Sequence, residues 1–328
     1  MFPVRPRTGP RPVVRAAHLD PAEVAQILLL TQAAGDADGA YPLSEHVTLH
    51  LRHGGDLPAV HLLARDRSGQ LVGYAHVDTT DLVEGASAEL CVHPLHRRRG
   101  LGRALVLEAL AAATDRGAHS LRLWAHGDHP SASALALSLG FTRFRVLWQM
   151  RRSLFAEVPP PVLPDGVVLR QFQPGRDEPA WLRVNGRAFA DHPEQGRWTE
   201  TDLRIRLAEA WFDPAGFLLA ERSADSALLG FHWTKVHGTL RHHRPGDDPP
   251  PAHDHDPIGE VYVLGVDPDA HGLGLGAALT LAGLRHLRAR GLDQVMLYVD
   301  ESNRTAGVLY QRLGFARWST DVCFRTAW

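Results

Sequence analysis

The sequence contains two similar segments at a constant spacing. Residues 90–102 read LCVHPLHRRRGLG and residues 264–276 read LGVDPDAHGLGLG, so each position of the second segment lies 174 residues after its counterpart (from 90 to 264). The spacing holds without a gap from residue 86 to residue 141, and both copies end in Leu-Gly-Phe. Because solenoid repeats are only about 20–50 residues long, so long a period indicates a duplicated domain. We therefore predict two homologous domains in one chain.

Proline marks the border between the two copies. Four prolines lie between residues 159 and 164, just before Asp165-Gly166, and proline stiffens the chain and blocks regular structure. We predict a first domain at residues 1–155, a linker at 156–166 and a second domain at 167–328. A chain of 328 residues has the length expected for two domains.

Composition excludes several classes of protein. The net charge of −2 gives no general attraction to nucleic acid or to anionic membranes. The two cysteines, Cys91 and Cys323, are too few for a disulfide scaffold or a four-thiolate metal site. The sequence has neither an apolar run long enough to span a membrane nor the apolar centre of a secretory signal. We predict a globular cytoplasmic protein that has no metal, nucleic acid or membrane partner.

Each copy has the order strand, glycine-rich turn, helix, strand, helix. In the second copy, residues 261–266 are rich in β-branched side chains and predict a strand. Gly274 and Gly276 then open a helix that Gly291 ends, and a strand at 294–299 and a short helix at 305–313 follow. This alternation predicts an α/β class with a mixed α+β sheet in each half.

The glycine-rich turn is suited to bind a phosphate. A helix N-terminus presents unpaired N–H groups and partial positive charge, and glycine lets an anion approach closely. In the first copy, Arg97, Arg98 and Arg99 add positive charge beside Gly100. The turn is neither a dinucleotide fingerprint nor a Walker loop, and one copy alone could be a simple helix cap. Two copies in the same context predict a pyrophosphate site.

The turn resembles the Arg/Gln-x-x-Gly-x-Gly/Ala motif of the GCN5-related N-acetyltransferases. The residues from Arg97 to Gly102 fit this motif fully, whereas the second copy has His271 at the first position. The resemblance implies two tandem acetyltransferase folds with acetyl-CoA as co-substrate. In the second turn, backbone amides would then bind the pyrophosphate. The cofactor-binding residues that it implies are Leu90, Cys91, Val92, Arg97, Arg98, Arg99, Gly100, Leu101, Gly102, Leu264, Gly265, Val266, His271, Gly272, Leu273, Gly274, Leu275, Gly276, Ala277, Asn303, Arg304, Thr305, Ala306, Gly307 and Val308.

Further blocks, mainly in the second half, resemble a tandem subgroup of this family in actinobacteria. They are residues 191–196 (DHPEQG), 230–235 (GFHWTK), 259–268 (GEVYVLGVDP) and 297–303 (LYVDESN). This subgroup acetylates the cysteinyl amine of cysteinyl-glucosaminyl-inositol by direct transfer in a ternary complex. The resemblance implies that Glu45, Glu194, Lys235, Glu260 and Tyr298 bind this acceptor. Lys235 is the single lysine of the chain.

Acetyl transfer to an amine needs a base, a donor to the carbonyl oxygen and a proton for the leaving thiolate. Glu260, at the start of the strand before the second turn, can act as general base. The N–H of Val266 or a near neighbour can meet the carbonyl oxygen. The resemblance places Tyr310 near the sulfur of CoA, where a phenol can donate the proton.

The first copy serves as an internal control. At the same spacing, Glu260 corresponds to Ala86 and Tyr310 corresponds to Ala136. Neither alanine can carry a proton. We predict that the second domain catalyses the transfer and that the first binds acetyl-CoA without catalysis.

Other interpretations remain open at this point. Glu260 could be an ordinary strand carboxylate, Tyr310 a core aromatic residue, and Lys235 and Glu45 simple surface residues. Cys91 also fits a small buried side chain. The enzyme could acetylate another amine, such as an aminoglycoside or a protein N-terminus, or the chain could be a non-catalytic acetyl-CoA-binding regulator.

Two further expectations concern a low-complexity stretch and the oligomeric state. The stretch at 237–257, rich in His and Pro, predicts a solvated loop, with a metal site as the alternative. Since the duplicated halves would replace the two subunits of a homodimer, we expect a monomer.

Overall fold

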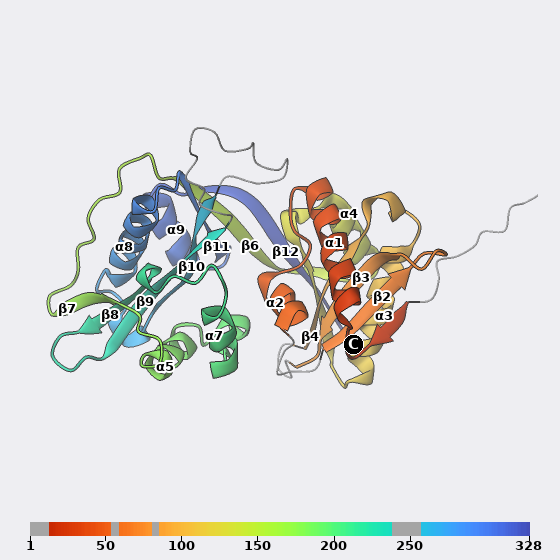
Figure 1. Ribbon diagram of the computed structural model, residues 1–328, viewed down its shortest axis with the longest axis horizontal. Coiled ribbons are helices and arrows are strands. Elements are labelled where there is room, and N and C mark those ends of the chain that lie inside the picture. The colour runs from red at the N-terminus through yellow and green to blue at the C-terminus, as the bar shows by residue number, and fades with distance from the viewer. Residues whose placement is uncertain (1–12, 54–58, 81–84, 238–256) are drawn as a thin grey trace, which may run out of the picture. The chain divides into compact units, whose positions relative to one another are not determined.

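The computed structural model describes residues 13–53, 59–80, 85–237 and 257–328, with side chains for all of these except residues 53, 193 and 194. The chain forms two compact units (Figure 1). The first comprises Met1–Leu147 together with Ser319–Trp328, and the second comprises Trp148–Trp318. Among the described residues, no helix is both long and apolar enough to cross a membrane.

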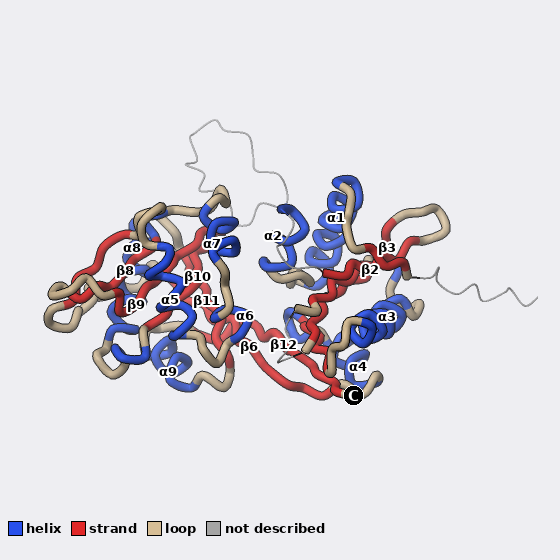
Figure 2. Tube along the Cα trace, turned by 90° about the horizontal axis from the view of Figure 1, so that it is seen from below, coloured by secondary structure: helices blue, strands red, loops and turns tan. Residues whose placement is uncertain are grey.

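The first unit is a mixed sheet covered by helices on both faces. Its strand order is β1-β2-β3-β4-β5-β12, where β12 is Ala316–Ala327. Among the described ladders of this unit, only the β4–β5 pair is parallel. Figure 2 shows α1 and α2 on one side of strands β2 and β3, and α3 and α4 on the other. The elements are β1 (Val14–Ala16), α1 (Pro21–Asp38), α2 (Glu45–His53), β2 (Ala59–Arg65), β3 (Leu71–Asp78), β4 (Ala86–Val92), α3 (Leu101–Asp115), β5 (Ser120–Ala125) and α4 (Pro130–Ser138).

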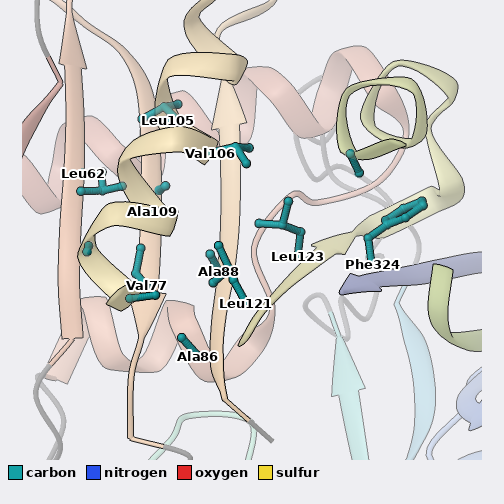
Figure 3. Packing of buried hydrophobic residues seen from close by; sticks show 14 of the residues in the cluster. Leu62, Val77, Ala86, Ala88, Leu105, Val106, Ala109, Leu121, Leu123 and Phe324 are labelled. Atoms are coloured by element: carbon teal, nitrogen blue, oxygen red, sulfur yellow. The ribbon is translucent and has the colours of Figure 1, made fainter. Parts of the chain in front are cut away.

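Strand alternation explains why two cores form in this unit. Successive side chains of a strand point to opposite faces, and Leu62 packs in the cluster under α3 whereas Leu63 packs in the cluster under α1. Figure 3 shows Leu105 and Ala109 of α3 lying over the strands, with Phe324 of β12 in the same cluster.

The second unit repeats this plan. Its strand order is β6-β11-β10-β9-β8-β7, where β6 is Thr142–Ser153. The β10–β11 pair is parallel, and the β9–β10, β8–β9 and β7–β8 pairs are antiparallel. The elements are β7 (Val167–Gln171), α5 (Glu178–Ala188), α6 (Pro193–Gly196), α7 (Glu200–Leu207), β8 (Phe217–Arg222), β9 (Leu228–His237), β10 (Ile258–Val266), α8 (Leu275–Ala289), β11 (Gln294–Asp300) and α9 (Arg304–Arg312). The predicted order of elements and the mixed α/β class are confirmed.

The C-terminal part of the last strand of each copy belongs to the other unit, namely residues 148–153 of β6 and 319–327 of β12. Strands β6 (Thr142–Ser153) and β12 (Ala316–Ala327) are equivalent in the repeat. Residues 322–327 of β12 nevertheless pair with β5 of the first unit, and Met150 of β6 packs in a core of the second unit. The predicted ranges follow the sequence repeat, whereas the compact units follow these contacts. The predicted linker at 156–166 accordingly lies within the second unit.

Candidate functional site

The two glycine-rich turns have the same backbone geometry. Gly100 precedes α3 with a φ of 85°, and its equivalent Gly274 precedes α8 with a φ of 75°. Arg98 has a φ of 60° at the position where the second copy has Gly272, with a φ of 81°. An L-residue in this region costs about 1–2 kcal/mol, so the first turn keeps its shape despite losing a glycine. The N-cap residue of each helix is glycine and provides no side-chain cap, so the first N–H groups of each helix are suited to an anion.

The first side chain of each turn makes the same contact. Arg97 Nε donates to the carbonyl of Val92 at 3.1 Å, and His271 Nε2 lies 3.2 Å from the equivalent carbonyl of Val266. The Arg97 guanidinium also forms two hydrogen bonds with Asp38, at 2.6 and 2.8 Å. In this structure, the first motif residue ties the turn to the end of the strand. His271 makes the equivalent contact to the strand, without the bonds that Arg97 adds to Asp38.

In both units, the parallel strands next to the turn diverge. The β10–β11 ladder covers residues 259–261 and 295–297, while β10 continues to Val266. The β4–β5 ladder covers residues 86–89 and 121–124, while β4 continues to Val92. The strand segments beyond each ladder can therefore present backbone groups to a ligand.

In each unit, the direction of one backbone N–H group follows from the hydrogen bonds at the end of the strand, beyond the parallel ladder. The N–H of Asp267 donates to Leu229 of β9. Since successive N–H groups of a strand alternate in direction, the N–H of Val266 points away from β9, toward β11. The equivalent N–H of His93 donates to Val72 of β3, so Val92 has the same orientation in the first unit.

The first unit contains a cavity of about 400 Å³ beside its turn. Ala136, the counterpart of Tyr310, lines this cavity, as does the buried Cys91. Burial raises the pKa of the Cys91 thiol to about 12, so it stays protonated. The other predicted cofactor-binding residues that line it are Leu90, Val92, Arg97, Arg98, Gly100, Leu101 and Gly102. Arg99 is exposed in the same turn.

Glu260 is a buried carboxylate on β10. The residue as a whole is 7% exposed, and its Oε2 lies 2.7 Å from Nε2 of His237. It stands opposite Lys235 in the antiparallel β9–β10 ladder. In the described part of the structure, Glu260 is therefore paired with a histidine.

Lys235 lies in an aromatic surrounding. It is 7% exposed, and its Nζ lies 4.6 Å from the ring centre of Trp211 and 5.2 Å from that of Tyr262. Cation–π attraction partly replaces the lost hydration of the ammonium. The structure therefore excludes the interpretation of Lys235 as an exposed surface lysine.

Tyr310 is buried on α9. Its ring packs edge-on against Phe315 at 5.7 Å, in the cluster that contains Val261. Because Val261 follows Glu260 in the strand, the two predicted catalytic side chains start from opposite faces of the sheet. Burial raises the pKa of the Tyr310 phenol to about 12, which keeps the hydroxyl protonated as a donor.

The sequence comparisons identify the family. The model of the Acetyltransferase (GNAT) family matches residues 29–141 and 185–315, one match in each copy. The chain belongs to the Acetyltransferase (GNAT) family. It is accordingly an acyltransferase, as predicted. The resemblance recognised in the motifs is confirmed, and acetyltransferases of this family use acetyl-CoA.

Relatives match over nearly the full length. A protein from Salinispora arenicola named mycothiol acetyltransferase is 59% identical, over 95% of this chain and 96% of that protein. Another of the same name, from Acidothermus cellulolyticus, is 56% identical over 94% of this chain and 92% of that protein.

Solved structures confirm the tandem GNAT fold. A GCN5-related N-acetyltransferase from Sphaerobacter thermophilus is 27% identical, with a TM-score of 0.69, over 98% of this chain and 97% of that one. A tandem GNAT protein from the clavulanic acid pathway is 21% identical, with a TM-score of 0.73, over 96% and 98%.

The remaining predicted cofactor-binding residues of this GNAT chain lie around the second turn. Leu264, Gly265 and Val266 end β10. Asn303 caps α9 by accepting a hydrogen bond from the N–H of Ala306 at 3.1 Å. The turn and the start of α8 contain Gly272, Leu273, Gly274, Leu275, Gly276 and Ala277, and the first turns of α9 contain Arg304, Thr305, Gly307 and Val308.

The other predicted acceptor-binding residues are dispersed. Tyr298 on β11 is 43% exposed, and its hydroxyl accepts a hydrogen bond from Gln149 at 2.8 Å. Glu45 begins α2 of the first unit and is half-buried. Glu194 lies in α6, and its side chain is outside the described part of the structure. Most of the predicted loop at 237–257, namely residues 238–256, is also outside the described residues.

Sequence reasoning missed a buried charged cluster beside the first cavity. His126 Nδ1 lies 2.9 Å from Asp321, and His126 Nε2 lies 3.7 Å from Glu89. Burial alone would lower the pKa of His126, but the hydrogen bond to Asp321 and the nearby negative charge of Glu89 raise it to about 10. The imidazolium therefore links β12 to the first unit. The sequence signal was one glutamate in the apolar strand β4.

Proposed function

We propose that this chain transfers the acetyl group of acetyl-CoA to the cysteinyl amine of cysteinyl-glucosaminyl-inositol, forming mycothiol. The observation that carries this proposal is the 59% identity, over 95% of the chain, with a relative named mycothiol acetyltransferase. The substrate is then a small, hydroxyl-rich amine. The monomeric state and the cytoplasmic location stay predictions.

Both units bind acetyl-CoA in this proposal, but the second catalyses the transfer. The two turns offer the same uncapped helix N-terminus to the pyrophosphate. The first unit has alanine at positions 86 and 136, and the second has Glu260 and Tyr310 at the equivalent positions. Proton transfer needs titratable groups, so the chemistry belongs to the second unit.

The transfer proceeds in one ternary complex. A substrate amine with a pKa near 7.7–8.0 is mostly protonated at pH 7, and Glu260 takes its proton directly or through a water. The amine nitrogen then forms a bond to the thioester carbon, and the N–H of Val266 stabilises the carbonyl oxygen. The C–S bond breaks, and Tyr310 gives its proton to the departing CoA thiolate. The new amide nitrogen loses its second proton, which returns through water to Tyr310, and Glu260 releases the first proton to solvent.

The acceptor is held mainly by polar groups. Hydrogen bonds and charges recognise a pseudodisaccharide better than apolar contacts do. Lys235 lies directly opposite Glu260 in the β9–β10 ladder, and the ring of Trp211 holds its ammonium in place. Tyr298 offers an exposed hydroxyl, while the contributions of Glu194 and Glu45 stay predictions.

Direct assay of the product tests the proposal. The protein is incubated with acetyl-CoA and cysteinyl-glucosaminyl-inositol, and the N-acetylated product is measured by mass. We expect turnover by the wild type and a fall in kcat of about 10²- to 10⁴-fold in Glu260→Gln, with the KM for acetyl-CoA unchanged.

A panel with an aminoglycoside and a peptide N-terminus serves as the control. Preference for either of these amines would overturn the proposed acceptor. Binding of acetyl-CoA without turnover on any amine would favour a regulator instead. Full activity of Glu260→Gln would remove this residue from the mechanism.

A further inference from the structure

His237 was predicted only as the first residue of a solvated loop, but it belongs to strand β9 and contacts the carboxylate proposed as the base. It is the last residue of β9, and its Nε2 lies 2.7 Å from Oε2 of Glu260. Its side chain is 36% exposed, whereas that of Glu260 is 9% exposed. His237 therefore lies between a buried carboxylate and solvent.

The register of the sheet makes this contact geometrically specific. Lys235 is directly opposite Glu260, and His237 is directly opposite Ile258. Side chains two residues apart share one face of a strand. His237 and Lys235 therefore flank Glu260 on the same face, with His237 in the diagonal position that long side chains can reach.

The chemistry of the pair fixes the direction of the hydrogen bond. An ionised carboxylate only accepts hydrogen bonds, so the imidazole must donate through its Nε2–H. This bond occupies Oε2 and restricts rotation of the carboxylate. Among the described contacts, the hydrogen bond uses Oε2, so we assign Oε1 to the amine.

We propose that His237 is a positioning residue that orients Glu260 for proton abstraction from the acceptor amine. This inference rests on the proposed function, because it assigns His237 to the same reaction. Lys235, directly opposite Glu260, is itself held by Trp211 and Tyr262. Both neighbours of the base on this face, Lys235 and His237, thus come from β9.

Two substitutions of similar size separate positioning from general structure. In His237→Gln the amide nitrogen takes the place of Nε2 and can still donate, whereas in His237→Asn it takes the place of Nδ1 and cannot reach Glu260. We expect His237→Asn to lower kcat about 10- to 100-fold with little change in the KM for acetyl-CoA. His237→Gln should recover most of this loss.

A double-mutant cycle supplies a readout that a structural role would not move. If His237 acts only through Glu260, adding His237→Asn to Glu260→Gln should cause no further loss of kcat. Thermal unfolding of each variant checks that the fold is kept. Equal activity of wild type and His237→Asn, or equal loss in His237→Asn and His237→Gln, would overturn the positioning role.

The failure of this inference is distinguishable from failure of the proposed function. An additive loss of kcat in the double variant would also contradict the positioning role. If the wild type itself forms no acetylated cysteinyl-glucosaminyl-inositol, the proposed function is wrong. If the wild type is active and the His237 variants give any of these three contrary results (no loss in His237→Asn, equal loss in His237→Asn and His237→Gln, or additive loss in the double variant), only the positioning role is wrong.

Discussion

His232 on β9 predicts a measurable loss of stability in acid. It is 0% exposed, and its Nδ1 lies 2.7 Å from the carbonyl of Leu279, to which it must donate. Among the described groups, its buried Nε2 has no hydrogen-bond partner. Protonation would place an uncompensated charge there, and burial accordingly lowers the pKa of His232 to about 4.

The size of the effect follows from the two pKa values of His232. Its ordinary pKa of 6.5 applies to the unfolded chain, and the folded value is about 4. Below pH 6.5 the unfolded state binds a proton that the folded state does not, so folding stability falls as the pH falls. Each pH unit in this window costs about 1.4 kcal/mol, which gives a loss of about 2 kcal/mol between pH 7 and pH 5.

Urea unfolding at several pH values measures this loss. Tryptophan emission is a suitable signal, since Trp181, Trp211 and Trp233 all belong to the core of the second unit. The variant His232→Asn keeps a donor near the carbonyl of Leu279 but cannot titrate. We expect it to lose about 2 kcal/mol less than the wild type between pH 7 and pH 5.

The first unit provides a control for this experiment. Burial also lowers the pKa of His61 to about 4, so part of the acid sensitivity should remain in His232→Asn. If wild type and His232→Asn lose the same free energy of unfolding over this range, the reasoning about His232 is refuted.

Three further substitutions test the site. Tyr310→Phe should lower kcat about 10- to 100-fold with unchanged KM values, because it removes the proton donor; a change in KM alone would contradict this role. Lys235→Met keeps the volume but not the charge, and should raise the KM for the acceptor about 10-fold while the KM for acetyl-CoA stays constant; an equal rise in both would argue against acceptor binding. Ala136→Phe should fill the first cavity and reduce bound acetyl-CoA, counted by calorimetry, from two per chain to one, with turnover retained; loss of turnover with that site would show that the first unit takes part in the reaction.

Much of the fold could be predicted because the repeat and the local signals agree. The glycines at positions 100 and 274 mark the start of α3 and α8 in both copies. Because glycine readily adopts a positive φ, these two turns could be predicted from the sequence. The positive φ of Arg98 could not be predicted in the same way, because arginine carries no local preference for it, although the repeat aligns Arg98 with Gly272.

The exchange of the last strands could not be predicted from the sequence. β6 and β12 occupy equivalent places in the repeat, and a strand pattern does not state which sheet it joins. The contact of Asp321 with His126 shows how the chain end is fixed in the first unit. Such pairings depend on long-range contacts that no local propensity encodes.

The same limit applies to the candidate site. Glu260 and Lys235 were recognised as single residues, but their placement side by side follows from the register of β9 and β10. His237 contacts Glu260 only because these strands pair across the intervening residues 238–256. The aromatic surrounding of Lys235 comes from Trp211, which lies outside every motif that the sequence analysis used.

A matched pair of variants tests most directly whether the second unit alone catalyses the transfer. Gly100→Asp and Gly274→Asp place a carboxylate at equivalent, sterically open positions, and aspartate tolerates positive φ better than most residues. The measurement is kcat/KM for acetyl-CoA. We predict that Gly274→Asp lowers it about 100-fold, because like charges repel at the pyrophosphate, and that Gly100→Asp leaves it unchanged. A loss in Gly100→Asp with full activity in Gly274→Asp would contradict the account.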